Sequence, residues 1–246
     1  HAHAQRAAPE VTGLPQLLIS EAHLRYAPII DSVDVQSFLE TQGSSLARYT
    51  VSADGKEALL SDVIARAAIR SSINPRVLLA LIQVRSGILT AYPSYVLSPE
   101  RLIGPASAPW ENGGVDTEVR WAASALNDML TCAKSSPECV LYSALTVDYE
   151  PWLSQTTPAS SALYRLAAQW GIEDWYARLV DENDGFVPTY SRWFGNPLSA
   201  PEFAPRLSSS ASADWLLPYA GDTVYYTGGP HAYGPPLKPP LEYKLP

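Results

Sequence analysis

The spacing of hydrophobic positions along the chain predicts a mainly helical protein. Apolar residues recur at intervals of three and four residues in four stretches, which is the period of a helix with one buried face. These stretches lie at residues 34–47, 56–71, 116–133 and 158–170. A fifth, aromatic segment covers residues 185–194. The fold class expected from this pattern is mainly α.

The stretch from residue 74 to residue 87 is apolar around nearly its whole circumference, unlike the other helical stretches. A helix that is apolar on all sides lies in the middle of a fold. Asn74 is a good N-cap, and Pro75 suits the first helical position because its missing N–H would be unpaired there. Gly87 provides a stop signal. The sequence therefore predicts that this helix is the central one.

Between the helices the sequence predicts long loops and little β structure. Residues 92–114 are rich in Pro, Ser and Gly, and we expect a long ordered loop over the core. Weak strand patterns occur at residues 49–55, 140–147 and 215–226. The paired prolines within residues 235–240 exclude a helix or a central strand. These features predict a small β-like tail at the C-terminal end.

The net charge argues against a nucleic-acid partner, and the hydropathy of the chain argues against a membrane span. The chain carries 25 acidic and 17 basic residues, a formal net charge of -8, without a cluster of Lys and Arg. Nucleic-acid binding needs such a cluster to neutralise phosphates. No stretch reaches the roughly 18 uninterrupted apolar residues of a membrane helix. We expect no nucleic-acid partner and no membrane span.

The two cysteines indicate an exported protein. Cys132 and Cys139 are close enough in sequence to close a small disulfide loop at a helix end, although a pair of free thiols is the alternative. Disulfides persist in oxidising compartments. The small, polar start of the chain resembles the residue left when an exported precursor is trimmed, or else an artificial end. We expect an extracellular or cell-envelope location.

The central segment carries a resemblance to a known family. Ile73-Asn74-Pro75, followed by Ala80-Leu81-Ile82-Gln83-Val84-Arg85-Ser86-Gly87, resembles the active-site helix of lysozyme-like lytic transglycosylases. In that family a glutamate ends the helix and protonates the glycosidic oxygen as general acid. The matching position here is Arg85, whose guanidinium stays protonated and cannot serve as an acid.

The resemblance implies a lysozyme-like domain whose catalytic position is degenerate. A guanidinium can still bind a carboxylate or stack on a ring, so the groove is expected to bind rather than cleave. The residues expected to line it are Arg85, Ser86, Tyr92, Tyr95 and Trp110.

A second resemblance lies near the C-terminal end. Trp215 to Tyr219, followed by Gly221 to His231, looks like the start of the catalytic domain of staphylolysin-like zinc metallopeptidases, which belong with the lysostaphin-type peptidoglycan endopeptidases. In that family the His of the Gly-Gly-Pro-His motif is the first zinc ligand, and His231 matches it. Only fifteen residues follow, without Asp or His. Catalytic zinc needs three protein ligands, so the site is incomplete and zinc is expected only if a peptidase domain is present.

The two resemblances together imply four parts of the chain. These are an N-terminal arm (residues 1–33), a lysozyme-like helical domain (34–196), a linker (197–214) and a truncated first segment of a metallopeptidase-like domain (215–246).

Other catalytic arrangements have weaker support. A Ser-His-Asp triad needs a placed histidine, and none of the four histidines lies near a nucleophile motif. Glu100, Glu111, Asp116 and Glu118 could form a displaced pair of glycosidase carboxylates. Acidic residues are also common at helix starts, where they favour the helix dipole.

Three hypotheses for the function remain. The first is a non-catalytic, exported module of the cell envelope that binds peptidoglycan, another envelope component or copies of itself, without a cofactor. The second is the N-terminal part of a peptidoglycan-degrading zinc endopeptidase whose catalytic domain is missing or removed. The third is a structural subunit of an extracellular polymer or surface layer. The chain as it stands is not expected to be an enzyme.

Overall fold

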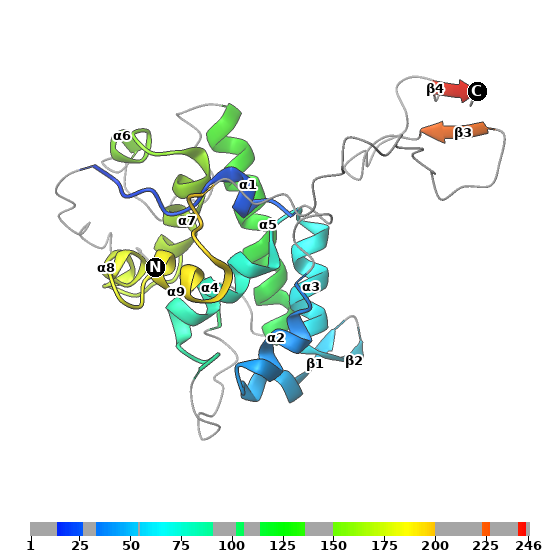
Figure 1. Ribbon diagram of the computed structural model, residues 1–246, viewed down its shortest axis with the longest axis horizontal. Coiled ribbons are helices and arrows are strands. Elements are labelled where there is room, and N and C mark those ends of the chain that lie inside the picture. The colour runs from blue at the N-terminus through cyan, green and yellow to red at the C-terminus, as the bar shows by residue number, and fades with distance from the viewer. Residues whose placement is uncertain are drawn as a thin grey trace, which may run out of the picture. The chain divides into compact units, whose positions relative to one another are not determined.

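The computed structural model describes residues 14–26, 33–53, 55–90, 102–105, 114–135, 150–199, 223–226 and 241–244 (Figure 1). The chain divides into two compact units, residues 1–203 and residues 204–246. The first unit is built mainly of helices, which confirms the expected fold class. Its helical elements are α1 (Glu21–Leu24), α2 (Val35–Thr41), η1 (Ser45–Arg48), α3 (Leu60–Arg70), α4 (Pro75–Ser86), α5 (Gly114–Ser135), α6 (Glu150–Leu153), α7 (Pro158–Ala168), α8 (Trp175–Val180) and α9 (Phe186–Phe194).

The predicted central helix is confirmed as α4. The side chain of Asn74 accepts a hydrogen bond from the N–H of Arg76 at 3.0 Å, and Pro75 occupies the first turn. Gly87 ends the helix in the left-handed conformation with φ 68°, which an L side chain rarely adopts. The run from Val77 to Ile82 is buried throughout. This burial follows from its position, since α4 contacts α3, α5, α8 and α9 (Figure 1).

The long helix α5 forms the second part of the core. It packs against α7 and α3 and contributes Val119, Ala122, Leu126 and Met129 as fully buried side chains. These residues recur at intervals of three and four, so one face is apolar over several turns. The helix begins two residues earlier than predicted, at Gly114 rather than at residue 116.

Two of the predicted helices are wrong in extent. The helix expected over residues 34–47 ends at Thr41, and η1 follows it. Gly43 separates the two with φ 64°, a turn conformation that no helix contains.

The helix expected from residue 56 begins instead at Leu60, because the preceding residues pair as a strand. Strand β2 (Lys56–Leu59) runs antiparallel to β1 (Thr50–Ala53). The predicted strand at residues 49–55 is therefore confirmed for its described part. Gly55, with φ 75°, stands at the turn of this hairpin.

Part of the segment predicted as an N-terminal arm belongs to the core. Leu18, Ile19 and Leu24 are 1% exposed or less. The main-chain N–H groups of Leu18 and Ile19 donate to Ser160 Oγ on α7, at 2.9 and 3.3 Å. These bonds satisfy buried donors that have no helix or strand partner. Residues 14–26 are thus anchored to α7.

The second unit contains one described hairpin. Strand β3 (Thr223–Tyr226) pairs antiparallel with β4 (Leu241–Lys244). This hairpin confirms a small β-like tail. Of the strand predicted for residues 215–226, only residues 223–226 are described. The strand predicted for residues 140–147 lies outside the described residues. Within the described residues, no helix combines the length and the apolar character that crossing a membrane requires.

Candidate functional site

Arg85 lies in the last turn of α4, where the sequence placed it at the degenerate catalytic position. Its side chain is only 4% exposed. A cation is favoured at a helix C-terminus because the last carbonyl groups carry partial negative charge. This effect is small beside the cost of burying a charge, so a buried guanidinium needs a carboxylate partner.

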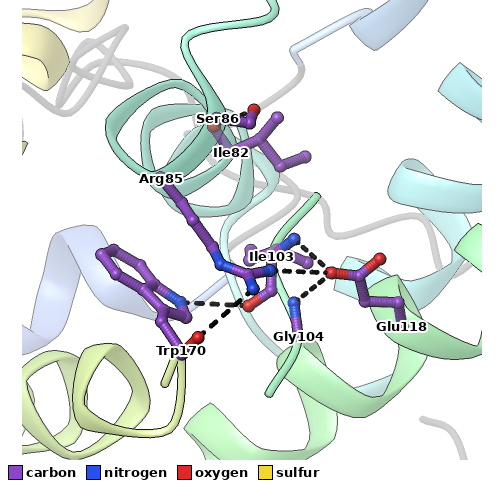
Figure 2. Close-up of polar contacts among 7 residues, drawn as sticks. All are labelled: Ile82, Arg85, Ser86, Ile103, Gly104, Glu118 and Trp170. Carbon is purple, nitrogen blue, oxygen red and sulfur yellow. Dashed lines mark hydrogen bonds and ion pairs between the residues drawn. The ribbon is translucent and has the colours of Figure 1, made fainter. Parts of the chain in front are cut away.

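The partner of Arg85 is Glu118 on α5, a residue 33 positions later in the chain. Arg85 Nη1 lies 3.0 Å from Glu118 Oε1, and the glutamate side chain is 3% exposed. Figure 2 shows the two side chains meeting between their helices. The structure therefore places Glu118 in a buried ion pair with Arg85. Its role as one of two glycosidase carboxylates stays a prediction.

A short segment, residues 102–105, closes over the same carboxylate oxygen. The N–H groups of Ile103 and Gly104 both donate to Glu118 Oε1, the first at 2.6 Å. A side chain at residue 104 would collide with Glu118 Cγ. Glycine is therefore needed at this position because the backbone approaches the glutamate so closely.

Trp170, just after α7, completes the arrangement (Figure 2). Its Nε1–H donates to the carbonyl oxygen of Ile103 at 3.1 Å, and its own carbonyl oxygen accepts from Arg85 Nη2 at 3.5 Å. The tryptophan is fully buried. Four segments distant in sequence thus meet at one buried ion pair.

Arg85 and Glu118 form a buried contact that is nearly closed to solvent. A guanidinium cannot release a proton at ordinary pH. Glu118 Oε1 already accepts three hydrogen bonds, while Oε2 is buried with no hydrogen-bond partner among the described residues. Both side chains are almost completely covered.

Of the other residues expected to line a groove, the structure describes only Ser86. The Ser86 hydroxyl donates to the carbonyl oxygen of Ile82 at 2.6 Å, so it is engaged within its own helix. Tyr92, Tyr95 and Trp110 lie outside the described residues, and their binding role stays a prediction.

Of the other acidic candidates, Asp116 forms an ion pair with Arg120 one turn later on α5. Glu100 and Glu111 lie outside the described residues.

The metal and disulfide predictions rest partly on residues outside the described ranges. His231 lies outside them, so the zinc prediction stays open. Within the described part of the chain, no three potential metal ligands gather in one place. Cys132 is nearly buried on α5, and no described cysteine is a free thiol. Cys139 lies outside the described residues, so its pairing with Cys132 stays a prediction.

Sequence reasoning missed that Arg85, Glu118, Gly104 and Trp170 act together. One signal was available, because a charged residue within an otherwise apolar helix requires a buried partner of opposite charge. Glu118 directly precedes Val119 in the apolar stripe of its helix, and this position marks it as a candidate. The approach of residues 102–105 is a tertiary contact with no local signal.

Comparison with known proteins gives the family. A family model described as LasA, N-terminal domain, matches residues 17–208. The chain belongs to this LasA N-terminal domain family. The match contains α4, α5 and the Arg85–Glu118 pair, and it agrees with the predicted relation to staphylolysin-like proteins. Membership indicates an exported protein related to peptidases.

The match to the LasA N-terminal domain ends before residue 215, so it does not cover the segment that looks like the start of a zinc peptidase. No curated protein and no solved structure matches the chain significantly.

Proposed function

We propose that the first unit is a non-catalytic module of an exported LasA-type protein, the N-terminal part of a peptidoglycan-degrading zinc endopeptidase. It acts by binding and assembly rather than by cleaving glycan. Family membership supports the peptidase context. The resemblance around Arg85 supports a helical arrangement of the lysozyme type in which the catalytic position has been lost.

The observation that carries this proposal is the buried pair of Arg85 and Glu118. Glycosidases of the lysozyme type need one protonated carboxyl group, and most need a second carboxylate about 5–9 Å away. Here a permanent cation stands at the position that the resemblance gives to the acid, and it pairs with the Glu118 carboxylate at 3.0 Å. A packed ion pair, closed over by residues 102–105, thus stands where an enzyme of the lysozyme type would have its catalytic acid.

The first experiment measures cleavage. The full chain is incubated with purified peptidoglycan sacculi, and soluble fragments are separated by chromatography, with a lysozyme as positive control. We expect no fragments from the wild-type chain. The Arg85→Glu variant is expected to release none either, because an acid there would lie buried beside Glu118. Fragment release by the wild type would refute the proposal.

The second experiment measures association. A separately produced LasA-type peptidase domain is titrated with the full chain, and both binding and the recovery of peptidase activity after refolding are followed. We expect the chain to bind that domain or to raise its recovered activity. Sacculi serve as the other binding target in a co-sedimentation assay. If the chain associates with neither, the module has no binding role of this kind.

The alternative of a structural subunit stays a prediction. It requires self-association, which sedimentation of the full chain at high concentration measures. A monomer at every concentration would count against it.

A further inference from the structure

A shallow notch on the surface between α3 and α5 brings three arginines together. It encloses little space and is open to solvent. Its lining residues are Val63, Arg66, Ala67, Arg70, Asp116 and Arg120. The notch is separate from the buried pair of Arg85 and Glu118 and plays no part in the proposed function.

The helix geometry explains why the arginines gather there. Arg66 and Arg70 are four residues apart on α3 and therefore share one face. The helix packs against α5, which carries Arg120. Between them, Val63 and Ala67 are buried and fill the contact between the two helices.

The charges in the notch do not balance. Asp116, whose side chain is 6% exposed, pairs with Arg120 and holds it in place. Arg66 donates from Nε to the main-chain oxygen of Asp62 at 3.3 Å, which leaves its outer nitrogens available. Arg70 is exposed and has no partner among the described residues. Three cations and one anion leave two positive charges, on a chain whose formal net charge is -8.

This arrangement costs stability when the notch is empty. Like charges four residues apart on a helix repel each other. A bound anion would reverse the sign of that interaction, since it is attracted to both guanidinium groups. Such an anion would therefore relieve the repulsion between Arg66 and Arg70.

We propose that this notch is a binding site for one anionic group, a carboxylate or a phosphate. The planar guanidinium can donate two parallel hydrogen bonds to either group, and Arg66 and Arg70 provide two such bidentate donors. Because the notch is shallow, it holds the charged group while the rest of the ligand stays outside.

The test is an NMR titration of the isotope-labelled full chain at constant ionic strength, with two probes. The first is inorganic phosphate, and the second is N-acetyl-alanyl-alanine, which presents a terminal carboxylate. We expect saturable shifts at Arg66 and Arg70 with at least one probe. Shifts with phosphate alone identify a phosphate-bearing ligand, and shifts with the peptide alone identify a carboxylate-bearing ligand.

The matched variants are Arg70→Gln and Arg48→Gln, since Arg48 is also an exposed arginine outside the notch. Arg70→Gln is expected to weaken binding about fivefold or more, because it removes one charged bidentate donor. Arg48→Gln changes the net charge equally and should leave binding unchanged. The site is refuted if neither probe gives saturable shifts, or if both variants weaken binding equally, since the effect is then general charge attraction.

Discussion

Replacing Arg85 with methionine tests whether the buried ion pair holds the core together. The change keeps much of the aliphatic volume and removes the positive charge. It leaves the Glu118 carboxylate, 3% exposed, with the N–H groups of Ile103 and Gly104 as donors but without its counter-charge. The result is a buried anion with incomplete compensation.

The expected magnitude follows from that environment. Removing one partner of a buried ion pair costs about 3–5 kcal/mol. The two main-chain donors remain, so we expect a loss near the lower end, about 3 kcal/mol of unfolding free energy. For a domain of this size that corresponds to a fall of roughly 6–12 °C in Tm.

A second substitution separates charge from packing. Glu118→Gln keeps an oxygen that accepts from Ile103 and Gly104 but carries no charge. Added to Arg85→Met, it should recover about 2 kcal/mol, because a buried pair replaced on both sides is often nearly neutral. Urea unfolding of the wild type, both single variants and the double variant gives the coupling energy. Arg48→Gln, on the surface, is the control and should change stability by less than about 0.5 kcal/mol.

Two results would refute this reasoning. One is a loss below about 1 kcal/mol for Arg85→Met, which would mean that the charge is solvated in the native protein. The other is a further loss when Glu118→Gln is added, which would mean that the carboxylate is stabilised without Arg85. Amide hydrogen exchange at Ile103 and Gly104, measured on the same four proteins, reports whether the covering segment stays closed.

Three further predictions concern other contacts. Gly104→Ala should destabilise the protein by about 2 kcal/mol or more in urea unfolding, because the added methyl group collides with Glu118; an unchanged midpoint would contradict the close approach. Asn74→Ala should cost about 1 kcal/mol by removing the cap of α4, with Asn74→Ser as a control that keeps a capping oxygen. The hydrogen bond from Lys134 lowers the pKa of the Glu21 carboxyl from its ordinary 4.5, so its stabilisation is present above that pH and disappears as pH falls through the lower folded value. Because Glu21 is 41% exposed, Glu21→Gln should cost only a few tenths of a kcal/mol at pH 7 and nothing at acidic pH, as measured by Tm against pH.

The parts of the fold that the sequence predicts well are those with local signals. Asn74, Pro75 and Gly87 specify both ends of α4 by backbone chemistry, and the apolar run between them requires burial. The predicted start of α3 was wrong. Leu59 and Leu60 continue the helical spacing of apolar residues, but pairing with residues 50–53 keeps residues 56–59 extended. Strand pairing is a tertiary contact that a helical period does not reveal.

The candidate site likewise has one feature with a local sequence signal and others that depend on tertiary contacts. The cation at residue 85 is visible in the sequence, at the position where the resemblance to lysozyme-like enzymes predicts an acid. Its burial is not visible, since it depends on α5, on Trp170 and on residues 102–105. The sequence therefore predicted an open groove lined by Arg85, whereas the structure has a closed contact at that residue.

This closed contact has a consequence for how the four segments are arranged. The Arg85 guanidinium and the amides of Ile103 and Gly104 all donate to one carboxylate oxygen of Glu118. Trp170 donates to the Ile103 carbonyl oxygen and accepts from Arg85. Hydrogen bonds to a buried carboxylate depend on direction as well as distance, so displacing one segment leaves the others with unpaired polar groups. A buried pair of this kind contributes little net stability compared with an apolar contact of equal volume. We therefore expect its main effect to be that it disfavours alternative packings of α4 against α5.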